Sequence, residues 1–381
     1  MTSVIAGGAA VEVGQATAPF GQATALPPRF YLDPALFELE QSRVFATGWV
    51  PLARAEQVAE PGTYLSVQLG SQPLVITCDA AGVPRVLANV CRHRAMPLAE
   101  GSGMCRTLRC EYHLWTYRLD GTLSGAPMMA EVDGFDRDQV RLPEFRHEIW
   151  QGWIFVNLDG RAAPLADQVS GLVAEIAEWR FSDMVSVATA SYEADWNWKI
   201  SVENFAEFYH HLGLHRDSLE PLLPAKTARC LDNRGQPWSS SWIGCSDDYL
   251  LVQGDPMKHL PPSHTMGMQI MCVFPLLCAG GQPASTFWLQ ILPISVDRHR
   301  LTWHVMVPAD QLTSPGLQAF VESSLVAIEQ IQEEDGAACR GVQRGLRAPA
   351  TATGRLAPLE LPLWQMQTWL LARLTDTTTT E

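Results

Sequence analysis

The amino-acid sequence predicts an α+β protein in which an all-β domain precedes a mixed domain of helices and strands. Within residues 50–160, short apolar runs alternate with turns rich in glycine and proline, which is typical of a small all-β domain. After residue 160, helical periodicity alternates with longer strand-like runs. At about 100–200 residues per domain, a chain of 381 residues has room for both domains.

The N-terminal region is predicted to form a leader and one helix. Residues 1–28 are rich in glycine, alanine and proline and lack the basic start of a signal peptide, so we expect a flexible leader. A helix is predicted over 34–46, because Asp33 can cap its first turn and Pro34 is tolerated at the first helical position. The predicted limits of the leader with its helix, the all-β domain and the mixed domain are 1–45, 46–160 and 161–381.

The mixed domain is predicted to combine helical segments with several strands. An apolar stripe at helical spacing covers 169–179, a second helix covers 198–211 and ends before Gly213, and a long helix follows Pro315. Strand-like apolar runs are predicted at 249–253, 268–278, 286–293 and 301–307.

The composition disfavours several classes of function. The chain has 27 Lys+Arg against 41 Asp+Glu, and its net charge of −14 argues against nucleic acid or an anionic membrane as partner. No apolar stretch reaches the length of about 20 residues that a membrane span needs. Nine cysteines without an export signal predict reduced thiols in a cytoplasmic protein. Most are expected to be small core residues: Cys78, Cys105, Cys230, Cys245, Cys272, Cys278 and Cys339.

The other two cysteines have histidines beside them. Cys91 and His93 form Cys-x-His, sixteen residues follow, and Cys110 and His113 form Cys-x-x-His. Such a set can bind zinc or an iron–sulfur cluster. Structural zinc sites usually begin with two cysteines on one loop, whereas one cysteine and one histidine per loop suit a centre of two irons, with both cysteines on one iron and both histidines on the other. A zinc site is the alternative.

A second group of candidate ligands lies in the mixed domain. On a continuous helix Glu203, Glu207 and His210 share one face, while His211 points about 100° away from it. We expect the chain to turn back after this helix, so that His215 meets the same face. A lone histidine is more often an ordinary polar residue, but three histidines in six residues beside a carboxylate favour a metal site.

Two imidazoles need a third ligand to hold Fe(II). The 2-His-1-carboxylate triad takes Asp or Glu and leaves positions for O₂ and substrate. On the long C-terminal helix Asp335 falls among apolar positions: Ile328, Ile331, Cys339 and Val342. A carboxylate in a buried stripe is costly unless it is paired or bound to a metal. Glu333 and Glu334 are expected on the solvated face.

These motifs resemble those of one family. The segment around Cys91 and Cys110 resembles the Rieske [2Fe–2S] motif of ring-hydroxylating oxygenase α subunits. The motifs NWK, ENF and Tyr-His-x₄-His resemble the mononuclear-iron segment of the same family, and QEEDGAACRGVQRGL resembles its C-terminal Asp helix. The likeness covers about residues 30–375. Ala95 and Leu114 stand where glycine is usual, and Glu111 stands where proline is common.

The resemblance implies an all-β Rieske domain and a helix-grip (START-like) catalytic domain with an antiparallel sheet. It implies a [2Fe–2S] cluster and a mononuclear Fe(2+) as cofactors. The implied cluster ligands are Cys91, His93, Cys110 and His113, and the implied iron ligands are His210, His215 and Asp335. Glu207 matches the bridging carboxylate, which lies between His210 and a Rieske histidine of the neighbouring subunit. Asn204 of the ENF motif is the second expected catalytic residue.

The family implies a terminal oxygenase component that works as a homotrimer. It receives electrons from a separate NAD(P)H-dependent flavin/iron–sulfur reductase, in some systems through a ferredoxin, and uses O₂ to hydroxylate a small molecule. Glutamate at position 207 resembles the choline, glycine-betaine and carnitine monooxygenase branch, which suggests monooxygenation of a quaternary ammonium compound with N-dealkylation. The alternatives are an aromatic-ring cis-dihydroxylating dioxygenase, a non-catalytic Rieske electron carrier and a zinc-stabilised ligand-binding protein.

Other histidines and tryptophans are assigned structural roles. His259 and His264 are expected in a loop, because Pro261 and Pro262 between them prevent a helix. His304 is expected to be structural or to line a pocket. Four tryptophans are expected in the core, with a cation-binding cage as the alternative: Trp238, Trp242, Trp288 and Trp303.

Overall fold

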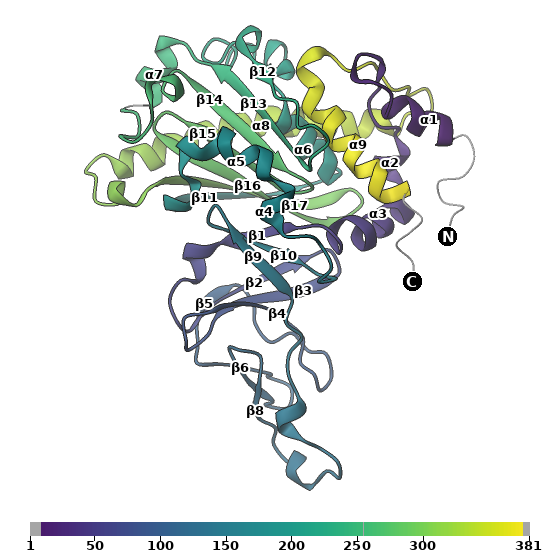
Figure 1. Cartoon of the computed structure of the whole chain (residues 1–381), viewed down its shortest axis with the longest axis vertical. Coiled ribbons are helices and arrows are strands. Elements are labelled where there is room, and N and C mark those ends of the chain that lie inside the picture. Colours follow the sequence, from purple (N-terminus) through teal and green to yellow (C-terminus); the bar gives the residue numbers. More distant parts are fainter. Residues whose placement is uncertain (1–8, 254, 376–381) are drawn as a thin grey trace. The chain divides into compact units, whose positions relative to one another are not determined.

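The computed structural model describes residues 9–253 and 255–375, and the chain forms two compact units. The β unit is Phe45–Ala162, and the mixed unit combines Met1–Val44 with Ala163–Glu381 (Figure 1). The α+β class is confirmed. The limits predicted for the two domains remain predictions.

The β unit consists of three antiparallel sheets. Their strand orders are β1-β10-β9, β4-β3-β2-β5 and β6-β7-β8. The strands are β1 Val50–Arg54, β2 Thr63–Leu69, β3 Gln72–Cys78, β4 Pro84–Ala88, β5 Ser102–Met104, β6 Thr107–Arg109, β7 Thr116–Arg118, β8 Leu123–Gly125, β9 Arg146–Trp150 and β10 Trp153–Asn157. Buried side chains from β3, β4, β7 and the loops beside them form one core, and this core includes Cys91 and Cys110.

The mixed unit is built on one seven-stranded antiparallel sheet, with the order β11-β17-β16-β15-β14-β13-β12. Its strands are β11 Met184–Ala194, β12 Arg229–Cys230, β13 Trp238–Gly244, β14 Gly267–Val273, β15 Leu277–Gln282, β16 Ser285–Ser295 and β17 Arg298–Pro308. The predicted run 268–278 is therefore two strands, because the chain reverses at Phe274-Pro275. The sheet is antiparallel throughout, as the resemblance implied.

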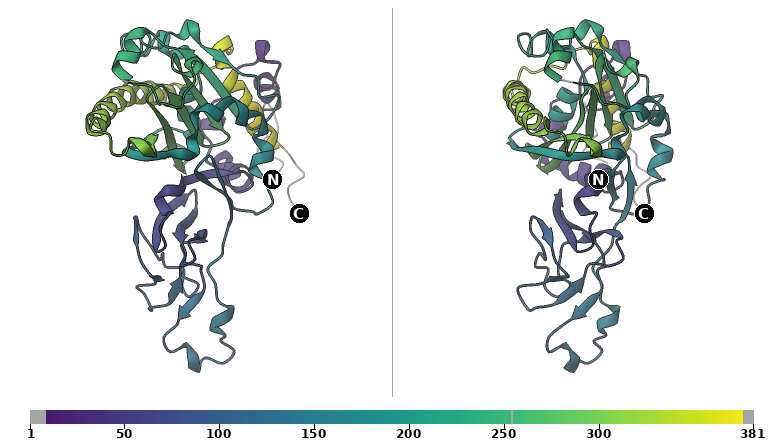
Figure 2. Two further views of the ribbon diagram at one scale, coloured as in Figure 1. Left: turned by 60° about the vertical axis from the view of Figure 1, so that its left-hand side comes forward. Right: turned by 90° about the vertical axis from the view of Figure 1, so that its left-hand side faces the viewer.

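The helices of the mixed unit pack around this sheet. They are α1 Ala9–Ala16, α2 Arg29–Leu32, α3 Pro34–Glu40, α4 Leu165–Gln168, α5 Ser170–Ile176, α6 Trp198–Ala206, α7 Asp247–Gln253, α8 Leu317–Leu346 and α9 Leu361–Thr375. The long helix α8 runs along one side of the sheet and contacts β11 and β17 (Figure 2). None of the helices in the described ranges is long and apolar enough to cross a membrane.

Two predicted elements have different limits or a different type. Asp33 caps α3 as predicted, with its Oδ1 accepting from the amide of Ala35 at 2.9 Å, but regular helix ends at Glu40 and a π-helical turn covers Gln41–Phe45. The predicted strand 249–253 is wrong, because this segment is helix α7. Its first turn carries two aspartates, and the Ser246 hydroxyl accepts from an amide of that turn at 3.3 Å, so the helix start is stabilised.

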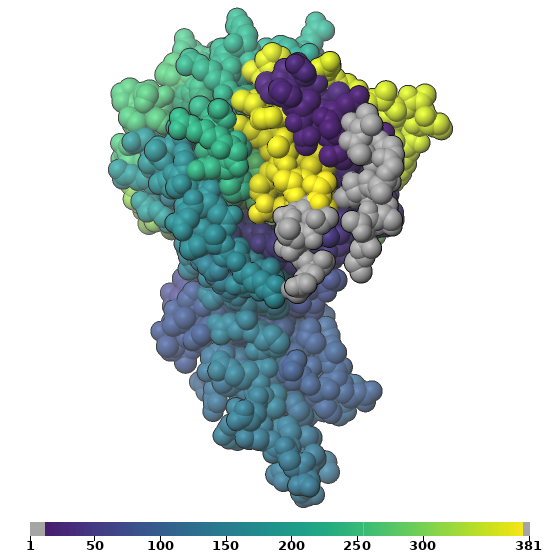
Figure 3. Space-filling model, turned by 45° about the vertical axis from the view of Figure 1, so that its right-hand side comes forward, coloured from purple at the N-terminus to yellow at the C-terminus, as the bar shows by residue number. Residues whose placement is uncertain are grey.

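The prediction of a flexible leader over residues 1–28 is wrong for residues 9–28, which the structure describes. Helix α1 contacts α9, and Figure 3 shows the N-terminal segment lying along this yellow helix. Gln367 donates its side-chain amide to the carbonyls of Ala16 at 2.6 Å and Thr24 at 2.9 Å, and Trp364 donates to Ala18 at 2.8 Å. These bonds satisfy backbone carbonyls that a flexible leader leaves to water. Residues 1–8 lie outside the described part of the chain.

Candidate metal centres

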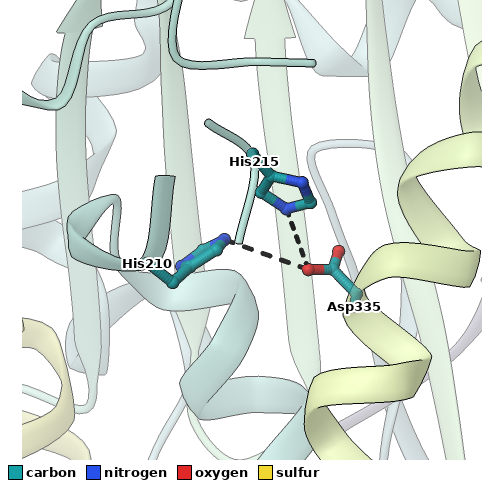
Figure 4. Close-up of side chains that lie close together, drawn as sticks. All are labelled: His210, His215 and Asp335. Atoms are coloured by element: carbon teal, nitrogen blue, oxygen red, sulfur yellow. Dashed lines mark hydrogen bonds and ion pairs between the residues drawn. The ribbon is translucent and has the colours of Figure 1, made fainter. Parts of the chain in front are cut away.

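Three side chains of the mixed unit converge on one point, as Figure 4 shows. His210 lies on the short 3₁₀ turn η8 (Tyr209–Leu212), His215 follows this turn, and Asp335 comes from α8. Asp335 Oδ1 lies 2.9 Å from His215 Nε2 and 4.0 Å from His210 Nε2, and one donor atom of each residue lies within 4.8 Å of the others. Two imidazoles and one carboxylate in this arrangement fit the facial ligand set of a mononuclear Fe(II).

The predicted helical face that joined Glu203, Glu207 and His210 is wrong. Helix α6 ends at Ala206, and Glu207 is extended, with φ −134° and ψ 165°. Its Oε2 accepts from the amides of Tyr209 and, at 3.2 Å, His210, while its Oε1 lies 2.8 Å from His210 Nδ1. A carboxylate that caps two free amides begins a new turn. Glu207 is therefore an extended residue outside the helix. Its side chain orients the His210 ring and caps the first amides of η8.

Glu334 does not lie on the solvated face. Its Oε2 lies 2.6 Å from His215 Nδ1 and 2.6 Å from the hydroxyl of Ser218. Burial raises its pKa, but the hydrogen bonds from Ser218 and His215 outweigh burial and hold the pKa of Glu334 below its usual value. Metal-binding histidines commonly donate a hydrogen bond from their second ring nitrogen to a carboxylate. This general pattern could have pointed to a carboxylate such as Glu334 from the sequence. Glu333 is exposed, as predicted.

Two other histidines of the mixed unit, His211 and His264, have structural roles. His211, which was expected to point away, is buried, with its Nδ1 3.2 Å from the carbonyl of Leu223. Burial, with the neighbouring His210, lowers the pKa of His211 to about 3. It is therefore a neutral, structural residue beside the ligand set. His264 packs edge-on against the rings of Trp179 and Trp242, so it belongs to a separate aromatic cluster.

A cavity of about 230 Å³ opens beside the three converging side chains. Phe287 lies at the centre of an aromatic wall, with ring centroids 6.2 Å from Phe205 and 5.7 Å from Trp303. Among the described residues the lining has no lysine or arginine, and its only carboxylates are Glu207 and Asp335. The cavity therefore suits an apolar or cationic ligand better than an anionic one.

The four tryptophans were expected in the core, and Trp238 and Trp288 are buried there, so the alternative of a cation-binding cage built from all four is wrong. Among the four candidates only Trp303 lines the described cavity, and it donates its indole N–H to Gln332 at 2.9 Å. Trp288 is buried and stacks on His304 with centroids 4.6 Å apart. Successive residues of a strand point to opposite faces of the sheet, so the side chains of Trp303 and His304 diverge.

The β unit places its two cysteine–histidine loops in matching conformations. In each loop the amide of the cysteine donates to the carbonyl five residues later, and its carbonyl accepts from the amide four residues later. These distances are 2.9 and 3.0 Å at Cys91 and 2.8 and 2.9 Å at Cys110. The fourth residue after each cysteine has a positive φ, 60° at Ala95 and 61° at Leu114. These are the positions where the family usually has glycine.

The side chains of the two loops fit a cluster with two cysteine and two histidine ligands. Cys91 and Cys110 are buried, and the rings of His93 and His113 lie 4.6 Å apart. The Nδ1 of His113 is buried and has no hydrogen-bond partner within the described ranges. A buried ring nitrogen without a partner is costly in a protein interior, and a metal ligand bond satisfies it. This pair of thiolates and pair of imidazoles matches the donor set of a Rieske centre.

Comparisons with known proteins agree with both centres. The family model for the ring hydroxylating alpha subunit (catalytic domain) matches residues 181–376, and the model for the Rieske [2Fe-2S] domain matches 48–138. The chain belongs to this family. As a Rieske oxygenase α subunit, it has a [2Fe–2S] cluster and a mononuclear iron as its cofactors.

Several relatives of this Rieske oxygenase are monooxygenase subunits. The carnitine monooxygenase oxygenase subunit of Escherichia coli (strain K12) is 33% identical over 192 residues, 50% of this chain and 51% of the relative, so the match spans about half the length of that relative. The chloroplastic choline monooxygenase of Beta vulgaris is 24% identical over 356 residues, 90% of this chain and 76% of the relative.

Solved structures share the fold of this Rieske oxygenase. The quaternary ammonium Rieske monooxygenase CntA in complex with L-carnitine matches with a TM-score of 0.80 and 22% identity, covering 96% of this chain and 99% of CntA. Naphthalene 1,2-dioxygenase from Rhodococcus sp. matches with a TM-score of 0.82 and 19% identity, covering 98% of this chain and all of that chain (100%). The fold is therefore common to monooxygenases and dioxygenases.

Proposed function

We propose that this chain is the oxygenase component of a Rieske monooxygenase that hydroxylates a small quaternary ammonium compound and thereby removes an N-alkyl group. The observation that carries the proposal is the ligand set of His210, His215 and Asp335 beside an aromatic cavity without lysine or arginine among the described residues. When bound, the cluster supplies electrons one at a time and the mononuclear iron activates O₂. Residues 46–160 are the proposed electron-transfer domain and 161–381 the catalytic domain.

The proposed ligands of each metal centre lie within one unit, and the two histidines of the mononuclear site each contact a second carboxylate. In the β unit, Cys91 and Cys110 hold one iron of the cluster while His93 and His113 hold the other. In the mixed unit, Glu334 accepts a hydrogen bond from Nδ1 of His215, so Nε2, which faces Asp335, is the nitrogen proposed to bind the metal. Glu207 does the same for His210, with 2.8 Å between its Oε1 and the ring Nδ1.

Glu207 is the proposed connection between the two redox centres. A second cavity, of about 550 Å³, is lined by Glu207 and His210 together with Tyr209 and Leu212. Tyr209 and Leu212 are 47% and 51% exposed, which suits a contact with another subunit. We propose a homotrimer in which a Rieske histidine of the neighbouring subunit reaches Glu207 there. The resemblance to the family supports this arrangement.

A quaternary ammonium substrate agrees with three observations. The cavity has an aromatic wall, its only charged side chains are carboxylates within the described part of the chain, and position 207 is glutamate. Aromatic faces and carboxylates attract alkylammonium groups. Asn204 lines both cavities, and its proposed role is to position substrate or water between Glu207 and the cavity.

Electrons are proposed to come from a separate NAD(P)H-dependent reductase with a flavin and an iron–sulfur centre, directly or through a ferredoxin. The cytoplasm is the proposed location, because a reducing compartment keeps Cys91 and Cys110 available as thiolate ligands.

Metal analysis with an absorption spectrum tests this proposal. We expect about three iron atoms per chain and a Rieske spectrum. Cys110→Ala should abolish the visible spectrum, and Asp335→Ala should remove only the mononuclear iron. Two iron atoms per chain indicate an electron carrier, and zinc alone indicates a ligand-binding protein. Product analysis with choline, carnitine and naphthalene then separates monooxygenation from dihydroxylation.

A further inference from the structure

Three ionisable side chains, two buried and one partly buried, form a network beside the proposed iron site. Lys199 on α6 donates to Glu40 Oε1 on α3 at 2.6 Å, and both side chains are buried. One turn further along α6, Glu203 accepts a hydrogen bond at its Oε1 from the hydroxyl of Tyr31 at 2.7 Å. Lys199 also lies over the Tyr31 ring, 5.6 Å from its centroid. The network thus contains one cation and two carboxylates.

An ionised Glu203 would give this network one more negative charge than positive charges. The Lys199–Glu40 pair is neutral as a whole, so an ionised Glu203 would be a second negative charge without a cation of its own. A buried charge without a partner is costly, and a carboxyl group in this position takes up a proton instead. Within the described part of the chain, the other titratable groups around Glu203 are Glu360 and the thiol of Cys339, and neither is a cation.

Glu203 also has a route to the proposed iron site. It is only partly buried, and it lines the second cavity together with Asn204, Glu207 and His210. Three of these residues, Asn204, Glu207 and His210, also line the substrate cavity. The side chains of Tyr209 and Leu212 line the second cavity as well and are exposed in the single chain, so water at the proposed subunit contact connects solvent to this cavity. Water in it can take a proton from Glu203 and return one from solvent.

We propose that Glu203 is a proton-relay residue that delivers protons through the second cavity to the Glu207–His210 side of the iron site. The inference rests on the proposed monooxygenase function. Hydroxylation of one C–H bond consumes O₂, two electrons and two protons: the O–O bond breaks, one oxygen atom enters the C–H bond, and the other leaves as water with both protons. The reductase supplies the electrons. Glu203 supplies a proton and is reprotonated from solvent through the same cavity.

The acidity of Glu203 suits this role. Burial raises the pKa of Glu203 to about 7, while the Tyr31 hydroxyl and Lys199 act in the opposite direction and Glu360 adds to the rise. A group that gives and takes protons near neutral pH works best when its pKa is close to the working pH.

Infrared spectroscopy of the purified enzyme, without substrate or turnover, tests the protonation state. The difference spectrum of wild type minus Glu203→Gln should contain the C=O band of a neutral carboxylic acid below about pH 7, and this band should vanish as the pH rises. Tyr31→Phe removes a bond that favours the ionised form, so it should move the midpoint upward. No neutral-acid band in the difference spectrum at low pH, or an unmoved midpoint in Tyr31→Phe, would overturn the inference.

Single-turnover product formation tests the relay itself. Glu203→Gln should keep its iron content and Rieske spectrum and form product about 100-fold more slowly near neutral pH, with the wild-type pH dependence lost. The exposed Glu333→Gln is the control and should match wild type. A product rate and pH profile in Glu203→Gln equal to those of wild type would refute the relay. Wild type without product in any assay refutes the proposed function instead, and the infrared result still stands.

Discussion

Ala95 and Leu114 have matching left-handed conformations in the two loops that hold the proposed cluster ligands. A side chain with a Cβ is strained at positive φ, by about 1–2 kcal/mol, whereas glycine is not. Leu114 is 49% exposed, so its removal loses little buried surface. We predict that Leu114→Gly raises the free energy of unfolding of the β unit by about 1 kcal/mol.

Urea unfolding followed through the cluster absorbance measures this change. Leu114→Ala is the matched control, because it removes the same side chain but keeps the Cβ. An unfolding midpoint for the glycine variant at or below that of the alanine variant would show that this loop carries no backbone strain.

Glu334 and Glu333 are adjacent carboxylates with different surroundings. Glu334 contacts His215 and Ser218, and Glu333 is exposed. Loss of an outer carboxylate that orients a metal-binding histidine typically lowers metal affinity 10–100-fold. We predict at least a tenfold weaker affinity for Fe(II) in Glu334→Gln and no change in Glu333→Gln, measured by competition with a chelator. Equal affinities in the two variants would contradict the role of Glu334.

At the scale of elements, the junction between α6 and η8 shows what periodicity cannot predict. The helix start was predictable, since Asn197 accepts from the Lys199 amide at 3.0 Å, a typical N-cap. The early end at Ala206 was not, because it depends on the Glu207 side chain bonding to amides that a continuing helix would use itself. The candidate residues are still brought together, although by a different backbone path.

His299 links β17 to the chain before α6, and it gives the mixed unit a pH dependence. Its Nδ1 lies 2.9 Å from the Trp196 carbonyl and its Nε2 2.8 Å from the Ser201 hydroxyl. The carbonyl only accepts, so the neutral ring donates from Nδ1 and accepts at Nε2, and a second proton breaks this pattern. Burial lowers the pKa of His299 to about 4.

The sign of this dependence follows from proton binding. An unfolded histidine has a pKa of about 6.5. Below that pH His299 is therefore protonated in the unfolded chain and remains neutral in the folded chain until the pH approaches its lower folded pKa. Stability is therefore full above about pH 6.5 and falls down to about pH 4, by about 3 kcal/mol for this group. His299→Asn does not titrate, so its loss of unfolding free energy over this range, measured with urea, should be smaller. Parallel curves for wild type and variant would contradict the prediction.

At the scale of the whole molecule, the cavity predicts a preference among ammonium compounds. A zwitterion such as carnitine brings a carboxylate into a space whose described lining has no lysine or arginine, whereas choline does not. Desolvating a carboxylate without a partner costs several kcal/mol, so we predict at least tenfold tighter binding of choline, measured by calorimetry. The neutral isostere 3,3-dimethylbutanol is the control for shape alone. Carnitine binding as tight as choline would contradict this description of the cavity.

The predictions from sequence agree best with the structure for the candidate metal ligands, because only a few residue types can bind a metal. The spacing of the cysteine and histidine pairs and the position of Asp335 among apolar residues predicted two groups of side chains, and the structure brings the members of each group together. Glu334 was missed because its role depends on the return of the chain at His215, a contact over 119 residues. The docked N-terminal segment was missed for the same reason, since Gln367 satisfies carbonyls more than 300 residues away.

In the proposed reaction, electrons from the cluster reduce O₂, and one of its two oxygen atoms enters the substrate while the other leaves as water. A single-turnover experiment with ¹⁸O₂ tests it most directly: the cluster is reduced chemically, choline is added with ¹⁸O₂, and cluster absorbance and product mass are followed together. Removal of an N-methyl group by monooxygenation should release formaldehyde that carries one ¹⁸O atom, trapped before exchange with water, as the cluster is oxidised. Cluster oxidation without product, or a product with two ¹⁸O atoms from naphthalene in place of choline, would contradict it.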